Sequence, residues 1–153
     1  MTAEDIVAAT LQFREDDRFH SGYCPEFALA LHSSFGGQLE VIWRTAENED
    51  EPVLSHVILS RENEDYDQFG AGAYENWENN WWQDPEYPSE FQSEEVTPEE
   101  LVLLVTENRQ GNCLRMPESV DWKMVESLKI QMAPLPEARA LHPETPSRGQ
   151  PVI

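Results

Sequence analysis

Three residues of types that could carry out nucleophilic chemistry lie in the first half of the chain: Cys24, His56 and Asp67. Cys24 precedes Pro25, and proline is favoured at the first helical position, so we expect Cys24 at a helix N-cap. A thiol there faces the positive end of the helix dipole and unpaired N–H groups, which favour the nucleophilic thiolate and could stabilise an oxyanion. The alternative is a small core residue, because cysteine is often buried.

A histidine in an apolar segment could act as the general base. His56 lies within Val53–Leu59, whose other residues are nearly all apolar, so its ring nitrogens need partners. If this strand pairs with the next one through a turn at 61–65, Asp67 would lie near His56 and orient its ring. The alternatives are a core histidine bonded to the backbone and a solvated turn carboxylate.

The order of these residues resembles the core of the papain-like superfamily, which includes NlpC-like peptidases, transglutaminase-like proteins and arylamine acetyltransferase-like enzymes. In both, a cysteine starts an apolar helix, a histidine lies inside a strand and an aspartate precedes a turn glycine. The likeness lies in Gly22–His32, Ser55–Val57 and Asp67–Gly70, within about residues 18–72.

The resemblance implies a thiol hydrolase or acyltransferase that acts on a peptide or amide substrate. Cys24 would be the nucleophile, His56 the base and Asp67 the orienting residue. Attack by sulfur would give a thioester that water or an amine resolves, without a cofactor. The candidates for the oxyanion hole are His20, Ser21 and Tyr23.

Other motifs for bound groups are incomplete. The chain has no C-x-x-C or H-x-x-x-H pair, so we expect no metal site. Gly70 and Gly72 lack the third glycine of a dinucleotide-binding loop and follow an acidic turn that would repel phosphate.

The charge of the chain suggests a second, non-enzymatic function. Its 153 residues include 30 acidic and 10 basic ones, for a net charge of −20. This balance opposes direct binding to nucleic acid or to an anionic membrane and favours a basic protein or peptide partner. The protein could be an acidic inhibitor or nucleic-acid mimic, of the kind that phages and mobile elements encode. The alternative is that the charge serves solubility alone.

Aromatic residues within an acidic stretch could anchor such a partner. Tryptophan and tyrosine are enriched in protein interfaces. The candidate partner-binding residues are Trp77, Trp81, Trp82 and Tyr87.

The elements that must position Cys24, His56 and Asp67 predict an α+β fold. It has an N-terminal helix and a Cys-bearing central helix packed on a small antiparallel sheet, with two C-terminal helices. Helical periodicity and capping residues predict the helices, and runs of β-branched and aromatic residues predict the strands. The expected helices are 2–14, 25–35, 98–108 and 119–132, and the expected strands are 39–44, 53–60 and 66–69, with 74–92 left unassigned.

We expect one domain over residues 1–132 and a disordered tail over 133–153, which is rich in proline. No run of about 18 apolar residues is present, which predicts no transmembrane helix. The acidic N-terminus does not fit a signal peptide, and two cysteines cannot form a disulfide framework. We therefore expect a cytoplasmic protein.

Overall fold

A computed structural model describes residues 2–20, 22–46, 52–82, 89–107 and 120–133. It shows an α+β fold in which five antiparallel strands form one sheet in the order β4-β3-β2-β1-β5. The elements in chain order are α1 (Ala3–Leu11), the short 3-10 helix η1 (Asp17–His20), α2 (Cys24–Phe35), β1 (Gln38–Ala46), β2 (Val53–Arg61), β3 (Glu64–Asp67), β4 (Gly70–Ala71), α3 (Ala73–Trp82), β5 (Ser89–Val96), α4 (Pro98–Glu107) and α5 (Trp122–Met132).

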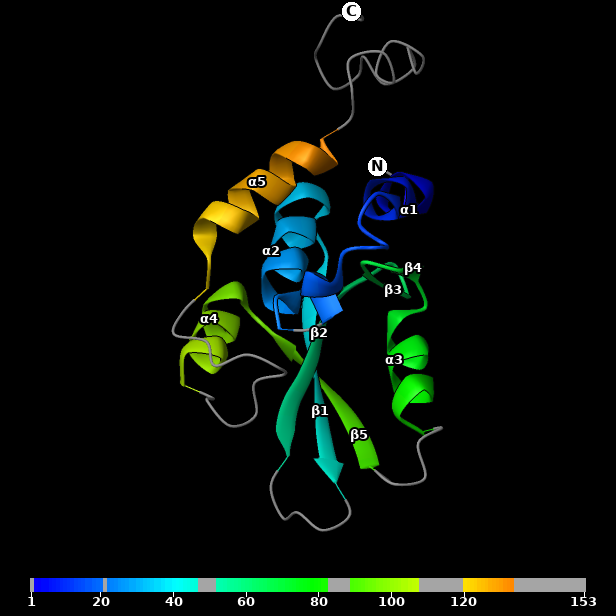
Figure 1. Ribbon diagram of the computed structural model, residues 1–153, viewed down its shortest axis with the longest axis vertical. Coiled ribbons are helices and arrows are strands. Elements are labelled where there is room, and N and C mark those ends of the chain that lie inside the picture. Colours follow the sequence, from blue (N-terminus) through cyan, green and yellow to red (C-terminus); the bar gives the residue numbers. More distant parts are fainter. Residues whose placement is uncertain (1, 21, 47–51, 83–88, 108–119, 134–153) are drawn as a thin grey trace, which may run out of the picture.

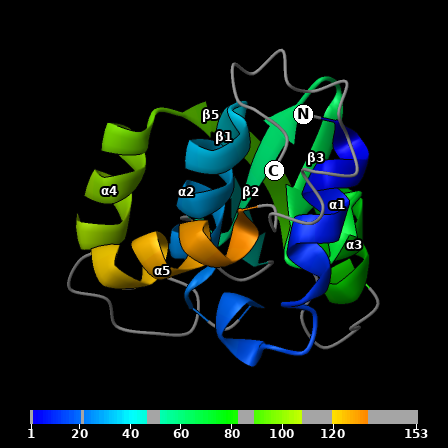
Figure 2. The same ribbon diagram turned by 90° about the horizontal axis from the view of Figure 1, so that it is seen from above.

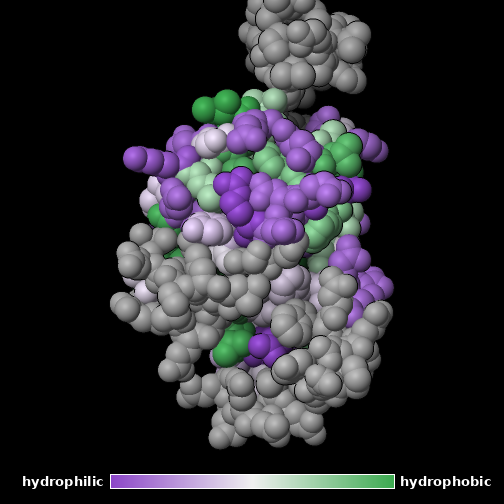
Figure 3. Space-filling model, viewed as in Figure 1, coloured by the Kyte–Doolittle hydropathy of each residue, from purple (hydrophilic) through white to green (hydrophobic). Residues whose placement is uncertain are grey.

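Helices cover both faces of the sheet (Figures 1 and 2). Helices α2, α4 and α5 lie on one face, and α3 lies on the other. Helix α1 lies beside β3 and the edge strand β4. Figure 3 shows hydrophilic side chains over much of the described surface of one side of the molecule, with apolar residues scattered among them.

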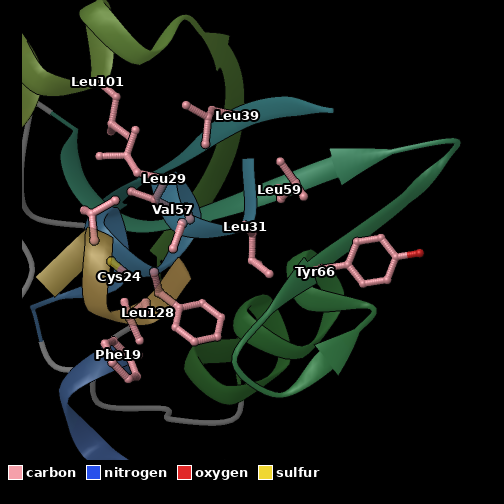
Figure 4. Packing of buried hydrophobic residues seen from close by; sticks show 14 of the residues in the cluster. Phe19, Cys24, Leu29, Leu31, Leu39, Val57, Leu59, Tyr66, Leu101 and Leu128 are labelled. Atoms are coloured by element: carbon pink, nitrogen blue, oxygen red, sulfur yellow. The ribbon is translucent and has the colours of Figure 1, made fainter. Parts of the chain in front are cut away.

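The larger of two apolar clusters lies between α2 and the sheet. Figure 4 shows part of it, with Leu29 and Leu31 of α2, Val57 and Leu59 of β2, and Leu128 of α5. Burying each such side chain contributes about 1.5–3 kcal/mol, so this cluster accounts for much of the stability of the fold.

A smaller cluster lies on the α3 side of the sheet. Ile42 of β1, Ile58 of β2 and Ala73 of α3 are fully buried there. Trp77 of α3 and Phe91 of β5 pack against them. Each sheet face therefore has its own apolar layer, and the side chain direction in β2 decides which layer a residue joins.

A β-bulge in β2 changes that direction. Ile42 pairs with His56, but the next residue, Trp43, pairs with Leu54, so Ser55 is the extra residue. Ser55 and His56 both contact Trp77 of α3, although successive strand residues normally point to opposite faces. The bulge thus adds Ser55 to the α3 face.

Most of the expected elements are present, with shifted ends. The first helix ends at Leu11 rather than Arg14, and the third strand covers Glu64–Asp67 rather than 66–69. The unassigned stretch contains most of α3 and the start of β5. The Pro-rich tail lies outside the described residues, apart from Ala133. Among the described helices, none is both long and apolar enough to cross a membrane.

Candidate functional site

Cys24 lies at the start of α2 but is packed inside the protein. It is the first helical residue, with Tyr23 at the N-cap, so the expected N-cap position for Cys24 was wrong by one residue. The expectation failed because the helix begins one residue earlier and includes the cysteine. The side chain is 2% exposed and lies in the larger cluster, near Phe19 and Leu128 (Figure 4). A thiol in this position is shielded from a substrate in solvent.

His56 and Asp67 form the expected pair. β2 and β3 pair antiparallel, and Nε2 of His56 lies 2.9 Å from Oδ2 of Asp67. Oδ1 of Asp67 also accepts the N–H of Phe69 at 2.8 Å, which fixes the carboxylate. Because a carboxylate only accepts hydrogen bonds, this contact assigns the proton to Nε2 of the imidazole.

Trp77 covers the imidazole of His56. The two rings are stacked, with centroids 4.1 Å apart and an angle of 9° between their planes. Nε1 of Trp77 donates to Oγ of Ser55 at 2.8 Å, which fixes the indole over the histidine. His56 is 1% exposed, and its Nδ1 is buried with no hydrogen-bond partner among the described residues. The pair is therefore closed off by α3.

The sheet separates Cys24 from His56. Cys24 belongs to the cluster that contains Val57 and Leu59, on the α2 side. His56 stacks on Trp77, which packs with the cluster on the α3 side. The structure thus brings His56 and Asp67 together but does not bring the thiol to them.

The oxyanion candidates lie near the start of α2. His20 is the last residue of η1, and Tyr23 is half-buried against the larger cluster. Ser21 lies outside the described residues. Because Cys24 is itself buried, Tyr23 does not form with it a reaction centre open to solvent.

The aromatic candidates for partner binding fall in or after α3. Trp77 is half-buried and its indole is used inside the fold. Trp81 and Trp82 belong to α3, but their side chains are outside the described part, as is the whole of Tyr87. These contacts of the indole hold α3 against β2.

A concentrated acidic surface, which the sequence reasoning missed, lies along β5 and the start of α4. The segment 89–107 contains glutamates and no lysine, arginine or histidine. The exposed members, which we call the β5–α4 acidic surface, are Glu90, Glu94, Glu95, Glu99 and Glu100. Half-buried Trp43 lies beside it, and its Nε1 donates to Oε1 of Glu94 at 3.2 Å. The run of glutamates without a cation was the available signal.

Carboxylates also meet on the α3 side of the sheet. Burial, followed by the charges of Asp65 and Glu95, raises the pKa of Glu40. Burial also raises the pKa of Asp65, while the N–H of Tyr74, which Asp65 accepts at 2.7 Å, opposes the shift. None of these three carboxylates forms an ion pair with a described cation. The acidic character therefore extends from the surface into the half-buried part of the sheet.

The described residues contain no group of three or more histidine, cysteine or acidic side chains that could hold a metal ion. A comparison of the chain with protein-family models, curated proteins and solved structures finds no match. The resemblance to the papain-like superfamily thus rests on the sequence pattern alone.

Proposed function

We propose that the protein is a non-enzymatic acidic binding protein that occupies a basic surface of a partner protein. The observation that carries this proposal is the β5–α4 acidic surface, in which five exposed glutamates occur in a segment, 89–107, that contains no lysine, arginine or histidine. Like charges held close together repel one another, and a cationic partner relieves that repulsion. Their succession along one edge strand and the start of α4 gives the protein a local concentration of negative charge.

The net charge of −20 supports the same function at longer range. A field of this size attracts cationic partners and accelerates their encounter, most strongly at low ionic strength. Trp43 lies half-buried beside Glu94, so the site combines charge with an aromatic side chain of the kind that anchors interfaces. Proteins that bind nucleic acid carry clustered lysine and arginine. The positively charged groove of such a protein would complement the β5–α4 acidic surface.

The geometry of the three catalytic candidates favours binding over catalysis. A general base must reach the proton of the nucleophile, directly or through one water molecule. His56 is enclosed between Asp67 and Trp77, whereas Cys24 is buried on the α2 side of the sheet. The thiol hydrolase therefore has less support than the acidic binding protein.

Removing charge from the acidic surface tests the proposal. The variant combines Glu90→Gln, Glu94→Gln and Glu99→Gln, which keeps side-chain size and the acceptor for Trp43. A matched control combines Glu4→Gln, Glu15→Gln and Glu75→Gln, all exposed and all outside β5 and α4. The probe is a short peptide of alternating lysine and threonine, and its Kd is measured by calorimetry at low salt.

We expect the surface variant to bind about tenfold more weakly, since each exposed ion pair contributes roughly 0.2–1 kcal/mol. The control should lose less than about threefold, because it removes the same net charge from elsewhere. Equal losses in the two variants would contradict a localised site. A wild-type protein that fails to bind the peptide at low salt would contradict the function itself.

A further inference from the structure

We propose that β5 binds its partner by strand addition, with a lysine- or arginine-bearing segment of the partner pairing as a sixth strand along the open edge of the sheet. This inference rests on the proposed function and adds the mode of recognition. It assigns β5 as the site and an extended basic segment as the ligand.

Within the described part of the chain, no strand pairs with the outer edge of β5. There β5 is the last strand of the sheet, and its partner is β1, from Ser89 opposite Ala46 to Val96 opposite Leu39. Gln92, Ser93 and the glutamates of the strand are exposed. In an antiparallel pair alternate residues direct their N–H and C=O groups away from the neighbouring strand, so an edge strand offers a row of hydrogen-bonding groups.

The side chains of β5 give this edge acidic character on both faces. Strand alternation places Glu90 and Glu94 on the face of Trp43, and Glu95 on the face of Glu40. A strand added beside β5 has its own side chains next to these residues, at the distance of a cross-strand pair. Lysine or arginine in the added strand can therefore form ion pairs on either face.

On the face toward α3, carboxylates from neighbouring strands lie together. Glu95 lies opposite Glu40 in the pairing of β5 with β1, and Asp65 adds a third carboxylate nearby. Burial, and after it the charges of Asp65 and Glu95, raise the pKa of Glu40, so this environment disfavours its charged form. A cation of the added strand beside Glu95 would lower that repulsion.

The same charges exclude a second copy of this chain as the occupant. Pairing two β5 strands edge to edge would place glutamates beside glutamates, which destabilises a sheet. Charged residues on an edge strand also prevent aggregation of this kind. The charges on β5 therefore favour pairing with a basic segment of another protein and disfavour pairing with β5 of a second copy.

The test compares two peptides on the intact wild-type protein. One is the alternating lysine–threonine peptide, and the other has the same sequence with every backbone nitrogen methylated. Methylation keeps all the positive charges but removes the N–H donors that strand pairing needs. Amide hydrogen exchange of β5 is followed with and without each peptide.

We expect the methylated peptide to bind at least about tenfold more weakly, because several backbone hydrogen bonds are lost together. We also expect alternate amides of β5 to gain protection only with the unmethylated peptide. Equal affinity of the two peptides without protection of β5 would overturn strand addition while leaving the acidic binding function intact. Failure of both peptides to bind would overturn both proposals.

Discussion

At the scale of single residues, His56 shows how a group suited to catalysis can be used for structure. Its ring joins two elements: Nε2 bonds Asp67 of β3, and one face stacks on Trp77 of α3. The sequence could predict the bond to Asp67, because a hairpin brings together strands that are adjacent in the chain. It could not predict that Trp77 covers the ring, since that contact depends on where α3 packs.

The position of Cys24 relative to His56 was beyond sequence reasoning for a different reason. The order of the two residues along the chain resembles that of a papain-like core, and both are buried. Which sheet face each one joins depends on the side of the sheet that α2 covers and on the direction of each strand residue. A short sequence pattern contains neither piece of information.

We predict that replacing His56 by alanine lowers the free energy of unfolding by about 2–4 kcal/mol. The change leaves Asp67 buried without its imidazole partner and opens a void beneath Trp77. Urea unfolding measures the loss. His32→Ala serves as the control, because His32 is half-buried and the one hydrogen bond of its ring within the described structure is to the turn carbonyl of Gly37. A loss below about 1 kcal/mol for His56→Ala would contradict the structural role.

The rate at which Cys24 is alkylated distinguishes a structural from a catalytic role of His56, because the two roles predict opposite changes in that rate when His56 is replaced. Cys113, which lies outside the described residues, is replaced by serine so that one thiol reports. We expect iodoacetamide to react slowly with Cys24, through transient opening of the fold, because the side chain is 2% exposed. His56→Ala should then accelerate the reaction, since it makes opening easier. A catalytic pair predicts the reverse, because loss of the histidine would remove the group that activates the thiol.

At the scale of elements, capping residues predicted the starts of α1 and α4, whereas α2 begins one residue earlier and α5 three residues later than expected. Thr97 and Glu100 form the expected capping box of α4, with hydrogen bonds of 2.8 and 3.1 Å between side chains and backbone N–H groups. By contrast, the start of α3 is fixed by Asp65 of β3, which accepts from the N–H of Tyr74. A helix whose cap comes from another element has no complete local signature, which explains why this stretch could not be assigned.

The turn from α2 into β1 requires a glycine at position 37. Gly37 has a φ of +102°, and a Cβ there would lie 2.7 Å from the carbonyl oxygen of Ser60. We predict that Gly37→Ala lowers the free energy of unfolding by about 2–4 kcal/mol, by backbone strain and by displacement of β2. Gly36→Ala is the matched control, because Gly36 also has a positive φ but a Cβ there meets nothing within 4 Å. Thermal unfolding should show a larger loss of stability for Gly37→Ala than for Gly36→Ala. Equal losses would contradict a steric clash between the added Cβ and Ser60.

The pairing of β1 with β5 gives the fold a dependence on pH. Because burial and nearby carboxylates raise the pKa of Glu40, the native state keeps this proton to a higher pH than the unfolded chain does. By linkage, stability then falls as the pH rises above the ordinary glutamate value of 4.5. We predict that Glu40→Gln raises the Tm at neutral pH by about 1–3 °C after allowance for solvent screening, and that the gain disappears near pH 4.

The control for this change is Glu99→Gln, which removes the same charge from the exposed surface of α4. It should leave the Tm within about 1 °C of the wild-type value. A Glu40→Gln protein with an unchanged or lower Tm at neutral pH would show that the charge of Glu40 does not oppose folding.

At the scale of the whole molecule, the net charge of −20 acts on stability and on binding in opposite directions. Described ion pairs such as Arg18–Asp16 and Lys129–Glu126 join residues close in the sequence, and each has one exposed partner, so they offset little of the total repulsion. The fold thus bears a cost in stability that a purely structural protein would not need. A cationic partner would recover part of that cost on binding.

Raising the salt concentration should change stability and partner binding in opposite directions. Raising NaCl from about 10 mM to about 1 M shortens the Debye length from roughly 30 Å to 3 Å. We predict that the Tm rises by several degrees, because self-repulsion is screened, while the affinity for the lysine–threonine peptide falls by more than about tenfold. The variant with Glu90, Glu94 and Glu99 replaced by glutamine should show a smaller rise and a weaker salt dependence of binding. A Tm that falls with salt would mean that ion pairs outweigh repulsion in the fold, and an affinity indifferent to salt would mean that charge does not drive recognition.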